Sequence, residues 1–180
     1  NDPVSLVKEI IQLGMGDVEH SYSQTHTQEE VAILDVLFVI DNSGSMSPYQ
    51  LELANQMALF MNIFIGSNAN YHLGFVTTDE ARLVEFEGLS WIDPTYVFPV
   101  YWTQGVIASI GIRGSGNEQG IYNAKAALLA SGVLGSEFIR DNATAVIIYV
   151  SDEEDHSVGT WASFTGFFDN FKSSPALMRH

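Results

Sequence analysis

Apolar runs and amphipathic stretches alternate along residues 31–171, and this alternation predicts an α/β domain. Residues 36–40 are apolar without interruption and mostly β-branched or aromatic, which is typical of a strand buried on both faces of a parallel sheet. Similar runs at residues 71–77 and 143–150 predict two further strands. Because stretches with helical spacing separate these runs, we expect a doubly wound, mostly parallel sheet with helices on both faces.

The helix after the first strand is predicted to begin with a capping box. Ser47 would be the N-cap, Pro48 would occupy the first helical position, and Gln50 would reach back to the cap. The sequence Gly66-Ser67-Asn68 would end the helix. Its apolar stripe, which we expect to pack on the sheet, consists of Ala54, Met57, Ala58, Met61 and Ile65.

The middle of the chain is less regular. Residues 81–86 are predicted to form a strand in a hairpin with residues 71–77, and the pattern then breaks down over residues 88–111. A long irregular stretch is usually functional or contains unrecognised elements. Its aromatic side chains could cover a small satellite core or form a partner-binding surface, and they include Trp91, Tyr96, Tyr101 and Trp102.

The amino-terminal residues 1–30 are expected to form an accessory segment before the main domain, residues 31–180. Their pattern fits a helix ended by Gly14 and Gly16 or an edge hairpin. His20 and His26 are expected to be solvated polar residues, because no third ligand lies at a useful spacing.

Small oxygen-bearing side chains follow the first buried strand at once. Asp41, Ser43 and Ser45 place a carboxylate and two hydroxyls at alternate positions, in the crevice where α/β folds bind ligands. Asp152 follows the strand at residues 143–150 in the same way. Such hard oxygen ligands suit Mg²⁺, Mn²⁺ or Ca²⁺, so the sequence predicts a divalent cation site.

The segment DNSGSM at residues 41–46, behind a buried strand, resembles the Asp-x-Ser-x-Ser signature of the von Willebrand factor type A (vWA) domain. This resemblance implies a Rossmann-like fold with a metal ion-dependent adhesion site, to which Asp41, Ser43, Ser45 and Asp152 would contribute. It covers residues 31–171 only. Because the family fold continues with further strands and a last helix, we expect the domain to be incomplete at its carboxyl end.

The loop at residues 114–120 departs from the family pattern. The family supplies a threonine hydroxyl to the metal from this loop, but residues 114–120, GSGNEQG, contain no threonine. Ser115 has the best position for that role, with Asn117 or Glu118 as substitutes. Asp79, after the second strand, could help to shape the site or be a solvated turn acid. Glu153 and the acids after it could hold a second cation or form a solvated loop.

Composition narrows the possible partners. Acidic residues number 22 against 7 basic ones, and the formal net charge of -15 argues against nucleic-acid or anionic-membrane partners. No apolar run is long enough for membrane insertion. The chain has no cysteine and does not begin with methionine. We expect an extracellular, cell-surface or periplasmic bacterial protein, with a cytoplasmic location as the alternative.

The resemblance implies a binding function. In the family, the cation keeps one coordination position open for an aspartate or glutamate carboxylate of a partner protein, so we expect a cation-dependent adhesion module and no enzyme. An assembly or chaperone-type subunit that works with an ATPase or chelatase is the alternative. A metal-dependent phosphatase-like hydrolase is less favoured, because Ser43 stands where such enzymes usually carry a second aspartate.

Overall fold

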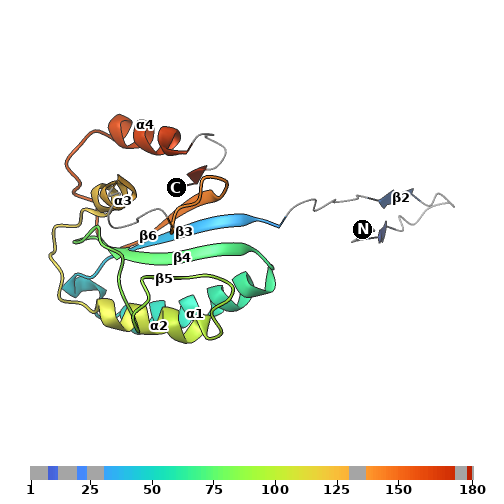
Figure 1. Ribbon diagram of the computed structural model, residues 1–180, viewed down its shortest axis with the longest axis horizontal. Helices are drawn as coiled ribbons and strands as arrows, with labels where there is room; N and C mark the ends of the chain where they lie inside the picture. Colours follow the sequence, from blue (N-terminus) through green and yellow to red (C-terminus); the bar gives the residue numbers. More distant parts are fainter. Residues whose placement is uncertain (1–7, 12–19, 24–30, 130–136, 173–177, 180) are drawn as a thin grey trace. The chain divides into compact units, whose positions relative to one another are not determined.

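The computed structural model describes residues 8–11, 20–23, 31–129, 137–172 and 178–179 (Figure 1). The chain divides into two compact units, Asn1–Val31 and Ala32–His180. In the first unit, β1 (Lys8–Ile11) pairs antiparallel with β2 (His20–Ser23), so the hairpin and not the helix is present over these residues. Gly14, Gly16 and His26 lie outside the described residues, as does the side chain of His20.

The second unit is an α/β fold built on a mixed, mostly parallel sheet with the strand order β5-β4-β3-β6-β7. The central strand β3 pairs parallel with both β4 and β6, whereas β5 pairs antiparallel with β4. The two-residue β7 extends the sheet by pairing parallel with β6. The strands are β3 (Ile33–Ile40), β4 (Asn70–Thr77), β5 (Trp91–Ile92), β6 (Thr144–Val150) and β7 (Met178–Arg179). The three parallel strands predicted from the apolar runs are therefore confirmed.

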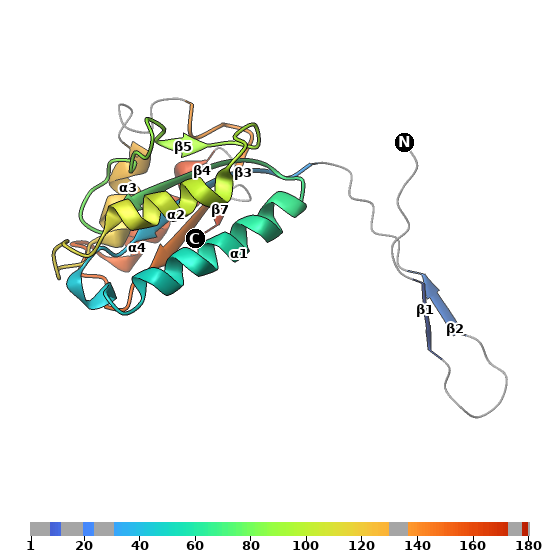
Figure 2. The same ribbon diagram turned by 90° about the horizontal axis from the view of Figure 1, so that it is seen from below.

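Helices cover both faces of this sheet, as expected (Figures 1 and 2). The helices α1 and α2 lie on one face, and α3 and α4 lie on the other. Alternate residues of β3 serve the two faces: Phe38 packs into the cluster under α1 and α2, and Val39 into the cluster under α3 and α4. The helices are α1 (Gln50–Gly66), α2 (Pro99–Ile110), α3 (Gly120–Leu129) and α4 (Trp161–Phe171). None of the described helices is long and apolar enough to cross a membrane.

The predicted capping box before α1 is wrong. A short 3-10 turn, η1 (Gly44–Met46), follows the loop, and Ser47 closes it by donating its N–H to the carbonyl of Gly44. The long helix begins only at Gln50, whose side chain donates to the carbonyl of Ile107 in α2 and does not reach back. The predicted end at Gly66 is confirmed, and Met57 and Met61 of the predicted stripe are buried in the core between α1 and the sheet.

The predicted third strand at residues 81–86 is also wrong. That segment makes a single backbone bond to β4, from Val84 N to the carbonyl of Phe75, and then turns between Phe86 and Leu89. The turn requires positive φ at Glu87 (52°) and Gly88 (78°), which interrupts an extended conformation. The hairpin partner of β4 is β5 instead, and the region that looked irregular contains β5 and α2.

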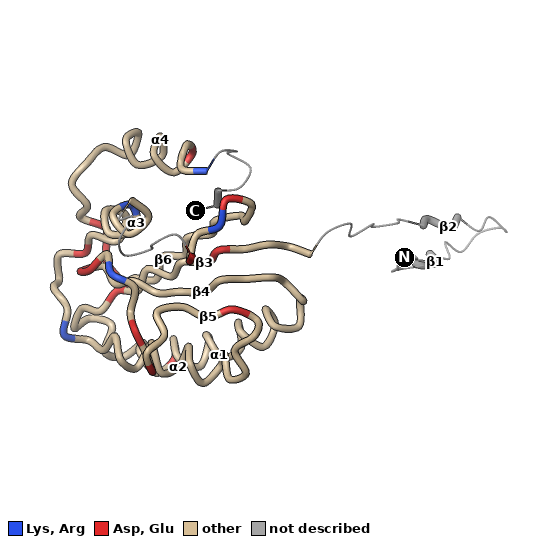
Figure 3. The backbone as a smooth tube through the Cα atoms, viewed as in Figure 1, with Lys and Arg blue, Asp and Glu red and all other residues tan. Residues whose placement is uncertain are grey.

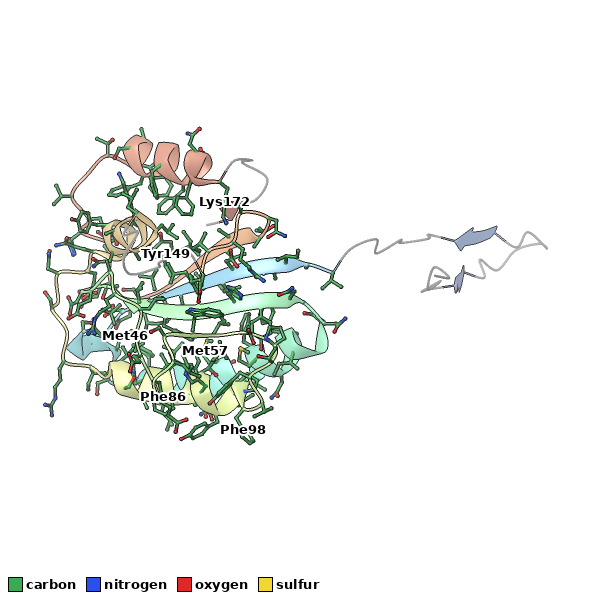
Figure 4. The ribbon with its side chains drawn as sticks, viewed as in Figure 1. Met46, Met57, Phe86, Phe98, Tyr149 and Lys172 are labelled. Atoms are coloured by element: carbon green, nitrogen blue, oxygen red, sulfur yellow. The ribbon has the colours of Figure 1, made fainter. Side chains whose placement is uncertain are left out.

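The amino end of β3 is held by a buried charge network. Asp35, only 1% exposed, accepts hydrogen bonds from the backbone N–H of Arg140 (2.7 Å) and from its Nε (2.8 Å). The ammonium of Lys172, which follows α4, lies 3.6 Å from the same carboxylate (Figure 4). Through Arg140 and Lys172, the network connects the segment before β6 and the segment after α4 to the central strand.

Candidate metal site

Asp41 lies completely buried at the carboxyl end of β3, where both neighbouring strands also end. Its backbone N–H donates to the carbonyl of Val150 at the end of β6 (2.9 Å), and the N–H of Thr78 after β4 donates to the carbonyl of Ile40 (3.1 Å). One carboxylate oxygen of Asp41 accepts the backbone N–H of Ser43 (2.8 Å). This Asx-type turn fixes the position of the Asp41 carboxylate relative to the backbone of Ser43.

A continuous set of hydrogen bonds joins the loop after β3 to the loop after β6. The hydroxyls of Ser43 and Ser45 lie 2.7 Å apart, and the Ser45 hydroxyl donates to Asp152 Oδ1 at 3.0 Å. Ser43 is buried, whereas Asp152 is exposed. The structure thus brings four of the predicted ligands, Asp41, Ser43, Ser45 and Asp152, together as a cluster of oxygen atoms with only two carboxylates.

The loop before α3 lies against the same end of the sheet. The N–H of Gly114 donates to the carbonyl of Asn42 (2.7 Å), and the N–H of Ser115 donates to Asp79 Oδ2 (2.8 Å). A Cβ on Gly114 would come within 2.5 Å of both the Asn42 and the Asp79 side chains, so only glycine permits this approach. The hydroxyl of Ser115 accepts the N–H of Asn117 (3.0 Å). The side chain of Asp79 therefore holds this loop in place by binding the backbone of Ser115.

Glu118, one of the substitute ligands, is only 1% exposed, and both of its carboxylate oxygens are buried inside the protein. Burial raises the pKa of this carboxyl, and the negative charges of Asp41, Asp79 and Glu153 raise the pKa further. A hydrogen bond with the side chain of Thr78, whose hydroxyl also donates to Asn42 Oδ1 at 3.3 Å, offsets part of this rise. Glu118 is thus an acid that lacks a positive partner.

Replacement of Glu118 by glutamine is expected to raise the midpoint of thermal unfolding at pH 7 in chelator. Because the folded-state pKa of Glu118 is raised, its contribution to stability is present below the unfolded-state pKa and is lost as the pH rises through the folded-state pKa. The gain should therefore disappear near pH 4, where both side chains are neutral. Calorimetry at the two pH values checks this, with Glu154→Gln, an exposed acid of the next loop, as the matched control. Equal gains at both pH values would contradict it.

The acids after Asp152 differ in what their carboxylates contact. Asp155 accepts the backbone N–H of Ile121 at the start of α3 (3.0 Å) and that of Ser157 (2.9 Å), while Glu153 and Glu154 are exposed. Within the described residues, no group of three or more His, Cys, Asp or Glu side chains is arranged to hold a metal ion. The predicted metal site differs from such a group, because it combines only two carboxylates with serine hydroxyls.

Only some of the aromatic side chains predicted to form a partner-binding surface are exposed. Trp102 is completely buried, and its indole N–H donates to the carbonyl of Phe86 (3.1 Å), so it belongs to the core between α2 and the sheet. Trp91 is half-buried against His72, with ring centroids 4.2 Å apart. Tyr101 is 53% exposed and donates to Glu87, and Tyr96 is half-buried. Trp102 is buried because α2, a helix that the sequence pattern did not reveal, packs this side chain against the sheet.

Sequence reasoning missed Ser151 and Asn42, which connect the loops. The hydroxyl of Ser151 donates to the second carboxylate oxygen of Asp41 (2.6 Å) and accepts the N–H of Glu153 (3.0 Å). Asn42 accepts from Gly114 through its backbone and from Thr78 through its side chain. Both residues directly adjoin predicted ligands, and this adjacency was the only sequence signal for them.

Several acidic residues lie in the loops at this end of the sheet, with a few basic residues among them (Figure 3). The arrangement can therefore attract a cation and offers oxygen atoms of the type that hard divalent cations prefer. No protein-family model matches the chain, and no curated protein matches it.

Proposed function

We propose that this chain is a divalent-cation-dependent protein-binding module of the vWA type. The observation that carries the proposal is the hydrogen-bonded series Asp41, Ser43, Ser45 and Asp152, which joins the ends of two adjacent parallel strands. A doubly wound order, with β3 between β4 and β6 and helices on both faces, supports the same assignment. In such sheets, ligands bind at the carboxyl ends of the strands.

The donor set fits Mg²⁺, Mn²⁺ or Ca²⁺. Asp41, Ser43, Ser45 and Asp152 would hold the ion, and Ser115 would complete the set from the loop before α3. Two carboxylates balance the formal charge of a divalent ion, and the neutral hydroxyl ligands add no further negative charge, so the ion would keep Lewis acidity toward one more oxygen ligand. Burial and the negative charges of Asp41, Asp79 and Glu153 raise the pKa of Glu118, and a cation bound in this region would offset those charges.

The partner is proposed to present an aspartate or glutamate carboxylate. A bound divalent ion would supply positive charge and an open coordination position for a carboxylate oxygen. The domain itself, with a formal net charge of -15, would otherwise repel an acidic group. Recognition of an acidic partner therefore requires the cation, and the exposed side chains of Asp152 and Ser115 stand at the rim where that partner would approach.

Selection of displayed peptides on the immobilised 180-residue chain tests this function. In Mg²⁺, we expect enrichment of peptides that contain Asp or Glu, and we expect their Asn or Gln versions and the same peptides in EDTA to bind at least about tenfold more weakly. Peptides that bind equally well in EDTA would contradict the proposal. Because the partner's carboxylate is the group tested, retention of binding by the Asn and Gln versions would also count against it.

Removal of the Ser115 hydroxyl is expected to weaken Mg²⁺ binding. Ser115→Ala should lower the affinity at least about tenfold, since loss of even an outer-shell partner commonly costs that much, whereas Ser115→Thr should bind within about twofold of the wild type. Isothermal titration with Mg²⁺ measures both, and Ser47→Ala, an exposed serine outside the cluster, is the control. If both Ser115 variants bind Mg²⁺ like the wild type, the third loop supplies a different ligand.

A further inference from the structure

The helix α1 carries apolar side chains on its outer face as well as on the face that packs against the sheet. Met57 and Met61 are buried in the core, yet Leu51 is 74% exposed, Leu59 56% and Ile63 77%. The outward positions of a surface helix are normally charged or polar, and a helix that is apolar all round is normally covered. The outer face of α1 therefore has the composition of a contact surface.

The exposed apolar residues of α1 belong to one row along the helix. Leu51, the exposed Asn55, Leu59 and Ile63 follow one another at intervals of four residues, and we call them the α1 row. Rows of this spacing are the ridges through which two helices pack. The α1 row has an apolar residue at each end. When the row is reversed, Leu51 stands opposite Ile63 and Asn55 opposite Leu59, so the row can pack against its own copy.

Charge is almost absent from this side of the domain. Charged residues make up 16% of the chain, but the 17 residues of α1 include only Glu52, and the 12 residues of α2 include none. The carboxylate of Glu52 accepts a hydrogen bond from the side chain of Gln56 on the same helix. The exposed residues of α2, which lies beside α1 (Figure 2), are Tyr101, Ala108 and Ser109. Depletion of charge is what distinguishes the core of a protein interface from other surfaces.

The helices on the other face of the sheet differ from α1. In α3, the exposed Tyr122 and Leu129 stand on either side of the charged Lys125. In α4, the exposed residues after Trp161 are small or polar: Ala162, Ser163, Gly166, Asp169 and Asn170. An exposed apolar row without a charged residue among its members is therefore a feature of α1 and not of every helix in this domain.

The charge of the chain points to the partner that fits this face. A basic partner would be drawn to the acidic loops, and not to a face with one carboxylate. A second copy, which also has a formal net charge of -15, is repelled by those loops and meets the least repulsion where charges are absent. A twofold interface requires a patch that is complementary to itself, and the α1 row meets this condition.

The size of the face is sufficient for a weak dimer. A helix of 17 residues is about 25 Å long, and two helices at the usual separation of about 8–10 Å present a face about 20 Å wide. This face is close to the roughly 600 Å² per partner that the smallest specific interfaces bury. Because the net charge of each copy opposes association, we expect a dissociation constant in the micromolar range.

We infer that two copies of this chain associate through the outer faces of their α1 helices. The two α1 rows run antiparallel across a twofold axis, and α2 lies at the edge of the contact. Glu52 of one copy then lies near Asn62 of the other and about 15 Å along the helix from the second Glu52, which is beyond the screening length of about 8 Å at physiological salt. The inference does not depend on the proposed metal function.

Sedimentation equilibrium of the 180-residue chain in EDTA tests this inference, because EDTA removes any contact made through a bound divalent ion. We expect a monomer–dimer equilibrium, with at least about half of the chain dimeric at about 100 µM. Leu59→Glu and Ile63→Glu, which place a charge in the α1 row, should each weaken the dimer at least about tenfold. Leu129→Glu adds the same charge at a leucine of similar exposure (59%) on α3, and this matched control should stay within about twofold of the wild type.

The salt dependence of the wild-type chain gives an independent measurement. Because the contact contains no ion pair and both copies are acidic, an increase in NaCl from about 0.02 M to about 0.3 M should strengthen the dimer at least about threefold. A contact made through ion pairs would become weaker over the same range.

A chain that stays monomeric at every concentration would overturn the inference, as would a dimer that weakens when salt is added. A dimer that survives both Leu59→Glu and Ile63→Glu unchanged would place the contact elsewhere and would contradict it too. Loss of the dimer in Leu129→Glu would place the contact on α3, with the same consequence. Should circular dichroism show that the glutamate variants do not fold, Leu59→Ser, which adds no charge, should still weaken the dimer at least about threefold.

Discussion

Asp41→Asn is expected to abolish the stabilisation of the domain by Mg²⁺ while leaving the fold intact. At a Mg²⁺ concentration one hundred times the dissociation constant, binding should stabilise the wild type by about 2.7 kcal/mol, or about 5–10 °C in the unfolding midpoint. The asparagine Oδ1 can still accept the N–H of Ser43, and its amide can donate to the Ser151 hydroxyl. The substitution therefore removes the charge and keeps the local geometry.

Thermal unfolding with and without Mg²⁺ measures this effect. Asp169→Asn, which removes an exposed carboxylate from α4, is the matched control and should show the full wild-type shift. The same Asp41→Asn variant should lose Mg²⁺-dependent peptide binding. A midpoint that still rises with Mg²⁺ by the wild-type amount would show that the ion binds elsewhere.

Asp35→Ala is expected to destabilise the domain by about 3–5 kcal/mol, as removal of one partner from a buried ion pair does. Asp35 has no exposed side-chain area, and its loss would leave Arg140 (20% exposed side chain) and Lys172 (5%) without their carboxylate. Burial lowers the pKa of Lys172, and the charge of Asp35 opposes that change. The alanine variant should therefore lose the attachments of two chain segments to β3 at once.

Urea unfolding of the wild type and the variant checks the size of this loss. Asp141→Ala, an exposed acid beside Arg140, is the control and should change the free energy of unfolding by no more than about 0.5 kcal/mol. A loss below about 1 kcal/mol for Asp35→Ala would mean that the network does not stabilise the fold. Because Asp35 lies at the amino end of β3, Mg²⁺ affinity should remain at the wild-type value in the surviving folded fraction.

The parallel strands β3 and β4 were predictable because residues 36–40 and 73–77 are buried on both faces and read as largely apolar runs. The strand β6 was also predictable from its apolar run, although only Ala145 and Ile147 of it are buried. In α4, Phe164, Phe168 and Phe171 stand at helical spacing in the sequence, and they pack toward the core. The start of α1 was not, because a capping-box pattern is local and η1 uses Ser47 to close a tighter turn. The helix α2 was missed because prolines and aromatic residues obscure its apolar period, although Pro99 occupies a favoured first-turn position.

The site was predictable only where a motif supplied spacing. Asp41, Ser43, Ser45 and Asp152 stand directly after apolar runs, and parallel pairing of β3 with β6 brings these positions together. Glu118 and Asp35 could not be recognised as buried, because burial of an isolated acid depends on tertiary packing and leaves no local pattern. The complete burial of Trp102 could not be predicted for the same reason.

Diffraction at the manganese absorption edge from crystals grown with Mn²⁺ would show whether the cluster of Asp41, Ser43, Ser45 and Asp152 binds a divalent cation. We predict an anomalous peak at the carboxyl end of β3, about 2.0–2.6 Å from oxygen atoms of the Ser43 and Ser45 hydroxyls, with Asp41 and Asp152 bound directly or through water. A peak bound only by other residues, or no peak at saturating Mn²⁺, would contradict the account.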